Sequence, residues 1–268
     1  MWFRSDLWSD EIWHAVRQAI LGARPQKHPL TVEICVGASQ RTFLKIFFAE
    51  TVVGALKDCF RRSKAVRALF ISEILSEKSF NAPVAVAAGE ERYARILRRS
   101  FVVTLPVEGS SLPDFLRHRL DPGGPALSLR FKREIVGELA LEIRRFHDQG
   151  FVHGDLVPSN IFATLDSQNA ARFCFMDNDR TRHYPLWWRH RLWRRNLVQL
   201  NRFPLAGISL QDRMRFFHVY VRSRKLGSRE RKVLRWLEHK TRQRRRECDA
   251  VDASGSFRKL MRWQAPGQ

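Results

Sequence analysis

The spacing of apolar residues at the start of the chain predicts a helix followed by a β-hairpin. Ser9 precedes a segment in which apolar residues recur at every fourth position, so it is a predicted N-cap. These apolar residues are Ile12, Val16 and Ile20. The runs 30–36 and 42–48 are rich in apolar and β-branched residues, and a short polar segment that begins at Gly37 separates them. Two adjacent strands with a turn between them follow from this pattern.

Lys45 is the only charged residue in the second of these strands. A lysine in an apolar strand is usually paired, or extends its amine to the surface along its aliphatic stem. Two interpretations stay open from the local sequence. Lys45 either neutralises the phosphates of a bound nucleotide or is a solvated charge on an edge strand.

The next segments predict a helix and two more strands. Residues 51–79 have a helical pattern, with Glu73 inside its apolar part and Glu77 one turn later. Residues 84–88 predict a short buried strand, with a turn beginning at Gly89. A further strand is predicted at residues 100–105, and an extended connector follows it.

The second half of the chain has a mainly helical pattern. A helix is predicted after Ser128 from one apolar stripe, with Gly150 as its stop. The stripe consists of Ile135, Leu139, Ile143 and Phe146. Residues 172–176 form an apolar strand. Two more helices are predicted, at 211–221 and 228–240. The arginine-rich segment from residue 242 to the end is predicted to be frayed or loosely attached.

The charge of the chain is concentrated in its last third. The 268 residues contain 48 basic and 27 acidic residues, a formal net charge of +21. Residues 1–179 hold a net charge of +3, whereas residues 180–268, with 24 basic and 6 acidic residues, hold +18. So large an excess predicts an anionic partner for this third of the chain. A nucleic acid is disfavoured because no recognition module is present.

Tryptophan and arginine alternate in the segment 183–197, which contains Trp187, Trp188 and Trp193. Such a stretch suits the headgroup region of an anionic membrane surface, and it equally suits a helix with core tryptophans and a solvated basic face. Both interpretations stay open.

The cysteines and the hydropathy pattern exclude several classes of protein. Cys35, Cys59, Cys174 and Cys248 stand far apart and form no CxxC pair, which argues against a zinc site or a disulfide framework. No window approaches the roughly 18 apolar residues of a membrane span, and the N-terminus lacks the apolar core of a signal peptide. The expected location is the cytoplasm, in association with a membrane surface.

One segment carries the chemistry, the sequence HGDLVPSN at residues 153–160, followed by a strand and Asp177. Phosphoryl transfer from ATP requires a carboxylate beside the attacking hydroxyl, oxygen ligands for Mg²⁺ and positive charge on the phosphates. Asp155 is the predicted base, and Asn160 and Asp177 are the predicted metal ligands. His153 is predicted to brace the loop. The alternative is that Asp155 and Asn160 only cap turns.

The segments 153–161 and 176–182 resemble those of the lipopolysaccharide kinase family, the Kdo and heptose kinases of the protein-kinase-like superfamily. The sequence DNDRTR at residues 177–182 is the more specific part, because aminoglycoside and choline phosphotransferases share the HGDL motif. The resemblance extends from about residue 43 to about residue 200. It implies ATP and Mg²⁺ as cofactors and a lipid A-core glycolipid as the acceptor.

Residue by residue, the resemblance implies a complete phosphotransferase site. Lys45 would contact the ATP phosphates, Glu73 would pair with Lys45, and Asp155 would be catalytic. Asn160 and Asp177 would bind Mg²⁺. The adenine contact is predicted from the chain itself, because the strand that ends at Leu105 and its extended connector look like a hinge between two lobes. Backbone groups between Leu105 and Glu108, including those of Val107, would hydrogen-bond the adenine edge.

The predicted fold is therefore α+β, a protein-kinase-like fold of two lobes. A nucleotide-binding lobe with a small antiparallel sheet is expected at residues 1–106. A mainly helical lobe at residues 107–268 is expected to carry the catalytic loop and the basic, substrate-facing and membrane-facing region.

The chain also departs from the pattern of protein kinases. No GxGxxG motif precedes Lys45, and no Ala-Pro-Glu sequence follows Asp177. Gly154 replaces the arginine that senses activation-loop phosphorylation, and Asn178-Asp179 replaces Phe-Gly. Asp179 is either a second metal ligand or a partner of Arg180 or Arg182. Two alternative functions stay open, a small protein or small-molecule kinase and a non-catalytic basic binding module.

Overall fold

The structure is a computed structural model that describes residues 2–4, 7–26, 28–36, 40–49, 61–120, 129–185, 187, 189–205 and 207–253. Its contacts divide the chain into two compact units. The first contains Met1–Phe115, His153–Asp155 and Asn160–His183, and the second contains Leu116–Val152, Leu156–Ser159 and Tyr184–Gln268. The predicted boundary of functional lobes at residue 106 is a different division and stays a prediction.

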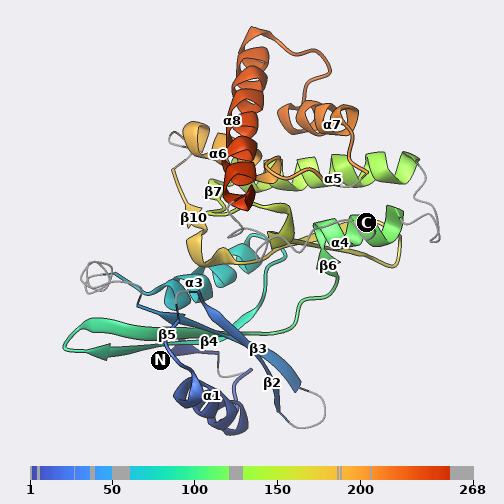
Figure 1. The fold of residues 1–268 in the computed structure, drawn as a ribbon. Coiled ribbons are helices and arrows are strands. Elements are labelled where there is room, and N and C mark those ends of the chain that lie inside the picture. Colours follow the sequence, from blue (N-terminus) through green and yellow to red (C-terminus); the bar gives the residue numbers. More distant parts are fainter. Residues whose placement is uncertain are drawn as a thin grey trace. The chain divides into compact units, whose positions relative to one another are not determined.

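The first unit contains a five-stranded antiparallel sheet (Figure 1). Its strands are β1 (Trp2–Phe3), β2 (Leu30–Val36), β3 (Gln40–Phe48), β4 (Ala85–Tyr93) and β5 (Ile96–Thr104). Their order across the sheet is β1-β4-β5-β3-β2. Lys45 lies on β3, opposite Thr31 of β2 and Val102 of β5. The interpretation of Lys45 as an edge-strand charge is therefore wrong, because β3 is paired on both sides.

Two helices cover the opposite faces of this sheet (Figure 1). Helix α1 (Asp10–Gly22) buries Ile12 and Val16 against one face, and the Ser9 side chain accepts a hydrogen bond from the backbone of Ile12, as predicted. Helix α3 (Lys64–Glu77) packs on the other face. Its buried contacts are Ala65, Val66 and Leu69. Strand β3 therefore buries side chains on both of its faces, with Leu44 and Ile46 toward α1 and Phe47 toward α3, as its nearly continuous apolar sequence requires.

The turn predicted at Gly89 is wrong, because β4 continues to Tyr93. The β4–β5 turn lies instead at Ala94 and Arg95, whose φ angles of 47° and 69° are the left-handed conformation that a two-residue hairpin needs. Gly89 serves close packing, since a Cβ there would lie 2.3 Å from the Phe101 ring. A glycine inside a strand can mark such an approach rather than a turn.

A second sheet in the first unit has three strands in the order β6-β8-β9. These are β6 (Ser110–Ser111), β8 (Ile161–Leu165) and β9 (Ala171–Phe175), so the strand predicted at 172–176 begins and ends one residue earlier. The short elements η1 (Pro158–Asn160), η2 (Asn178–Arg180) and β10 (Arg182–His183) flank it in sequence. Helix α4 (Leu112–Leu120) follows β6.

The second unit is mainly helical. Its elements are α5 (Leu129–Asp148), β7 (Phe151–Val152), α6 (Arg189–Leu200), α7 (Leu210–Val221) and α8 (Ser228–Ala253). The predicted stripe of α5 is buried from Ile135 to Phe146. The described residues do not include the predicted turn at Gly37, residues 51–60, Ser128 or the tail beyond residue 253.

The prediction of a frayed segment at residues 242–246 is wrong within the described part of the chain, because α8 extends through it. Ion pairs one turn apart join Arg242 to Glu238 and Arg244 to Glu247. Arg245 also donates hydrogen bonds to the carbonyls of residues 201 and 202. Local arginine density suggested fraying, whereas pairing with glutamates and with backbone carbonyls stabilises the helix.

Asp212 connects helices α5 and α7. It is buried, forms a capping box with Ser209, and lies 3.0 Å from Lys132 Nζ of α5 and 3.0 Å from Arg215 Nη1. Burial by itself would raise the pKa of Asp212, but hydrogen bonds from Ser209 and the charge of Lys132 outweigh it and lower the pKa to about 2. The folded state is therefore stabilised by ionised Asp212.

We expect Asp212→Asn to lower the free energy of unfolding by about 2 kcal/mol at pH 7, since one pKa unit corresponds to about 1.4 kcal/mol. Because the folded-state pKa is depressed, this contribution is complete above about pH 4 and disappears as the pH falls toward 2. Urea unfolding at several pH values measures it. Glu134→Gln is the matched control, since Glu134 is half exposed in its pair with Arg130. Equal destabilisation by the two variants would contradict the role of Asp212.

Candidate active site

His153 connects the two segments that carry the predicted catalytic and metal-binding aspartates. Its Nδ1 accepts a hydrogen bond from the backbone N–H of Asp155 at 3.1 Å, and its Nε2 lies 2.8 Å from the carbonyl oxygen of Met176. Because a backbone N–H can only donate, Nδ1 must be unprotonated, and Nε2 carries the proton that it donates to Met176. Burial lowers the pKa of His153, which favours this neutral form. The predicted bracing position of His153 is what the structure shows.

Gly154 lies where a side chain has no room. A Cβ at this position would be 2.1 Å from the Cβ of Arg180 and 2.7 Å from its carbonyl oxygen. The sequence indicated only that Gly154 replaces a regulatory arginine. The structure adds a steric reason, because the loop that follows Asp177 passes directly against residue 154.

The β8–β9 hairpin brings Asn160 and Asp177 to the same end of the second sheet. Ile161 pairs with Phe175, so Asn160 immediately precedes the hairpin and Asp177 follows it by two residues. The Asn160 Nδ2 donates to the carbonyl oxygen of Asp155 at 2.9 Å, and the Met176 N–H donates to the Asn160 carbonyl at 2.8 Å. Hydrogen bonds within the first unit therefore join Asp155 to Asn160, and Asn160 to Met176, the residue before Asp177.

Asp177 forms an ion pair with Lys45 of β3. The lysine side chain is 26% exposed and the aspartate side chain 39% exposed. Asp177 has a left-handed backbone, with φ 57° and ψ 52°. Aspartate tolerates this conformation better than most residues, and such conformations cluster at functional sites. Lys45 is thus a paired strand lysine whose partner is the predicted metal ligand.

Asn178 and Thr181 hold the segment after Asp177 in place, and both are buried. The Asn178 Nδ2 donates to the Phe175 carbonyl at 2.5 Å, and the Thr181 Oγ1 donates to the Asn178 Oδ1 at 2.9 Å. Sequence reasoning missed these roles. An amide and a hydroxyl three residues apart in a turn are the signal that would have indicated them.

Asp179 is buried in this same segment, with 8% of its surface exposed. Burial is the largest cause that raises the pKa of Asp179, followed by the negative charge of Asp177. The positive charges of Lys45, Arg180 and Lys64 act in the opposite direction. Asp179 is therefore a second carboxylate in the electrostatic environment of Lys45 and Asp177.

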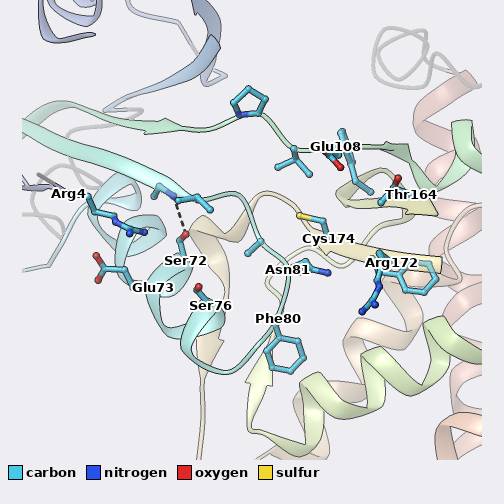
Figure 2. A pocket seen from close by; sticks show the side chains of 17 residues that line it. Arg4, Ser72, Glu73, Ser76, Phe80, Asn81, Glu108, Thr164, Arg172 and Cys174 are labelled. Atoms are coloured by element: carbon cyan, nitrogen blue, oxygen red, sulfur yellow. Dashed lines mark hydrogen bonds between the residues drawn. The ribbon is translucent and has the colours of Figure 1, made fainter. Parts of the chain in front are cut away.

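Glu73 lies exposed on α3 and lines a cavity of about 380 Å³ (Figure 2). In Figure 2 the Arg4 guanidinium points toward the Glu73 carboxylate. Val107 lines the same cavity, whereas Lys45, Asn160 and Asp177 do not. The structure thus pairs Lys45 with Asp177 and places Glu73 at this cavity. The predicted Lys45–Glu73 pair stays a prediction.

The connector after β5 provides backbone groups for the predicted adenine contacts. The Leu105 N–H donates to the carbonyl of Val84 at 2.9 Å, so this N–H is already used. The carbonyl of Leu105 and the backbone of Val107 are the groups to which the adenine prediction now applies.

The donor set at Asn160 and Asp177 fits Mg²⁺. Because Asn160 Nδ2 donates to Asp155, the Asn160 Oδ1 is the atom of that amide suited to a cation, and Asp177 adds carboxylate oxygens. Mg²⁺ prefers oxygen ligands of this kind. Among the described residues, no group of three or more His, Cys, Asp and Glu side chains is arranged for metal binding, so this two-residue set is the candidate.

None of the helices in the described part of the chain has the length and apolar character to cross a membrane.

Comparisons with known proteins identify the family. A model of the lipopolysaccharide kinase (Kdo/WaaP) family matches residues 39–220. The fold is similar to that of a solved structure of WaaP in complex with acyl carrier protein. The TM-score is 0.56 and the sequence identity 24%, over 83% of this chain and 87% of that chain. No curated protein matches the chain. The predicted α+β kinase-like fold is confirmed, and the predicted family is confirmed as well. Since the family model covers more than half of the sequence, the chain belongs to the lipopolysaccharide kinase (Kdo/WaaP) family.

Proposed function

We propose that the protein transfers the terminal phosphoryl group of ATP to a sugar hydroxyl, on Kdo or heptose, of the lipopolysaccharide inner core. Family membership implies a kinase and the use of ATP. The observation that carries the finer proposal is the arrangement of Lys45, Asp155, Asn160 and Asp177, which the first unit joins through an ion pair and a set of hydrogen bonds.

In this proposal Asp155 orients the acceptor hydroxyl and accepts its proton. The backbone of Asp155 is held on both sides, since its N–H donates to His153 and its carbonyl accepts from Asn160. Fixing the backbone limits the positions that the carboxylate samples, which is how a base is kept within reach of a hydroxyl. Lys45 supplies positive charge for the nucleotide phosphates, and Leu105 and Val107 supply backbone groups for the adenine. Glu73 is proposed as the residue that holds Lys45 once nucleotide is bound.

Asn160 and Asp177 would hold Mg²⁺ through their side-chain oxygens. The ion, when bound, supplies positive charge that neutralises the phosphate oxygens during transfer. Lys45 and Asp177 already form a pair of opposite charge, so the site contains both the cation for the phosphates and the anion for the metal.

The last third of the chain is proposed to face the anionic glycolipid and the inner membrane surface. It belongs to a proposed substrate-facing lobe at residues 107–268, and a nucleotide lobe is proposed at residues 1–106. On α8 the exposed basic residues include Arg231, Lys232, Arg235, Arg242 and Arg246. Each basic residue near an anionic surface contributes on the order of 1 kcal/mol. Trp187 is 74% exposed, which suits a membrane headgroup interface. Trp193 packs on Tyr220, which suits a helix with core tryptophans. Acyl carrier protein, which is present in the solved WaaP complex, is a further binding partner to test.

The proposed function predicts that purified protein, ATP and Mg²⁺ phosphorylate lipid A-core glycolipid. Mass spectrometry of the core oligosaccharide locates the added phosphate on Kdo or heptose. Protein substrates and aminoglycosides are the comparison acceptors. Transfer to either of these but never to glycolipid would overturn the proposal, as would salt-dependent anion binding without any transfer.

We expect Asp155→Asn to reduce kcat by a factor of about 10² or more while leaving ATP binding within about twofold, because the amide cannot accept the hydroxyl proton. Steady-state transfer assays and calorimetric ATP titration measure the two effects. Asp166→Asn is the matched control, since it makes the same change in the turn of the β8–β9 hairpin. Unimpaired transfer by Asp155→Asn would show that the base has been misassigned.

For the metal ligand, we expect Asp177→Ala to weaken Mg²⁺-ATP binding by at least tenfold and to shift the Mg²⁺ dependence of transfer to higher concentration. Titrating Mg²⁺ at fixed ATP measures this shift. Asp114→Ala serves as the comparison, because it removes a carboxylate that accepts a hydrogen bond from Ser111 Oγ at the start of α4. An unchanged Mg²⁺ dependence in Asp177→Ala would contradict the assignment.

A further inference from the structure

We propose that Gln199 is a positioning residue for the catalytic loop, acting on the peptide bond between Asp155 and Leu156. The Gln199 Oε1 accepts a hydrogen bond from the Leu156 N–H at 3.2 Å. Gln199 lies on α6, more than 40 residues beyond the HGDL motif, and it is part of no motif that the sequence displays. This inference rests on the proposed function, because it assigns Gln199 a role in the chemistry of Asp155.

The Asp155–Leu156 peptide is held at both of its polar ends. Its N–H is bound by Gln199, and its carbonyl oxygen accepts from Asn160 Nδ2 at 2.9 Å. A trans peptide is a rigid plane, so two hydrogen bonds on its opposite edges fix the direction of the plane. The adjoining torsion of Asp155 is fixed with it. The N–H of Asp155 is already bound to His153, and Gln199 therefore completes the set of contacts that orient this residue.

A buried chain of hydrogen bonds holds Gln199 in the orientation that accepts from Leu156. The Asn196 Nδ2 donates to the same Gln199 Oε1 at 2.9 Å, and the Asn196 Oδ1 lies 3.1 Å from His147 Nε2. The His147 Nδ1 in turn lies 2.8 Å from the Tyr220 hydroxyl. Since Asn196 Oδ1 can only accept, His147 donates from Nε2, and its Nδ1 accepts from Tyr220. Every link then runs in one direction and ends at the Gln199 oxygen.

The burial of this chain makes its direction costly to reverse. His147 and Tyr220 are each 2% exposed and Asn196 is 1% exposed. A buried polar group that loses its partner costs about 1–3 kcal/mol. A rotation of the Gln199 amide would place its NH₂ group against two donors, the Leu156 N–H and Asn196 Nδ2. The network therefore fixes the Gln199 amide with Oε1, rather than its NH₂ group, facing the Leu156 N–H, which requires an acceptor.

The test compares two substitutions that differ in this one acceptor. Gln199→Met keeps the length of the side chain and removes the oxygen, whereas Gln199→Glu keeps an oxygen that accepts from both donors. We expect Gln199→Met to lower kcat on the order of 10- to 100-fold, the usual cost of misplacing a reacting group, with KM for ATP within about twofold. Gln199→Glu should retain most of the activity. Gln18→Met, on the exposed face of α1, is the matched control and should match the unsubstituted protein.

A second measurement needs no acceptor. Amide hydrogen exchange at Leu156 should be about tenfold faster in Gln199→Met and unchanged in Gln199→Glu. If Gln199→Met does not fold, Asn196→Ser tests the same point, because it removes the donor that orients Gln199. It should accelerate the same amide by a smaller factor.

The two measurements separate the two proposals. Unchanged exchange at Leu156 in folded Gln199→Met, or in Asn196→Ser where Gln199→Met does not fold, overturns the positioning role, whatever the activity. Equal loss of kcat in Gln199→Met and Gln199→Glu also overturns it. Faster exchange together with an unsubstituted protein that never phosphorylates glycolipid overturns the proposed function instead.

Discussion

The ion pair between Lys45 and Asp177 joins two parts of the first unit that are 132 residues apart in sequence. Both side chains are partly exposed, and a pair of this kind contributes roughly 0–1 kcal/mol to stability. The pair is therefore a poor explanation for the fold. It is better understood as a local arrangement of charge, which brings the cation proposed for the phosphates and the anion proposed for the metal to one place at little energetic cost. A small stabilisation also means that ligands can replace either partner easily.

The positions of these two charges depend on different physical causes. Lys45 is placed by a strand that is paired on both sides and packed between two helices, so its backbone has little freedom. Asp177 is placed by a hairpin, by the buried contacts of Asn178 and Thr181, and by the His153 hydrogen bond to the carbonyl of Met176. The strand supplies rigidity through packing, whereas the loop supplies it through hydrogen bonds from short polar side chains.

The contrast between placement by packing and placement by hydrogen bonds explains which parts of the fold and of the site could be predicted from the sequence. Apolar periodicity, which can be read from the local sequence, predicts the strands, the capped first helix and the buried stripe of α5. The candidate roles of Asp155, Asn160 and Asp177 come from their order and spacing, and they stay predictions. The turn at Gly89 and the frayed end of α8 were predicted wrongly, because local sequence does not show tertiary contacts. Gly89 packs closely against Phe101, and an arginine of α8 donates hydrogen bonds to backbone carbonyls distant in sequence. The hydrogen bond of Gln199 and the steric role of Gly154 depend on contacts between segments far apart in sequence, which periodicity cannot reveal.

The polar residues after Asp177 bear on how this site differs from that of a regulated protein kinase. Where Phe-Gly would stand, the chain has Asn178-Asp179, and Asn178 is buried with its amide bonded to Phe175 and to Thr181. Moving this segment would break two buried hydrogen bonds, at about 1–3 kcal/mol for each group left without a partner. An aromatic side chain exchanges between apolar pockets without such a penalty. Gly154 adds a second restriction, since Arg180 fills the space beside it. A segment held in this way favours one arrangement of Asp177. Under the proposed function Asp177 is a metal ligand, and a loop held in this way has less need of an external signal to order it.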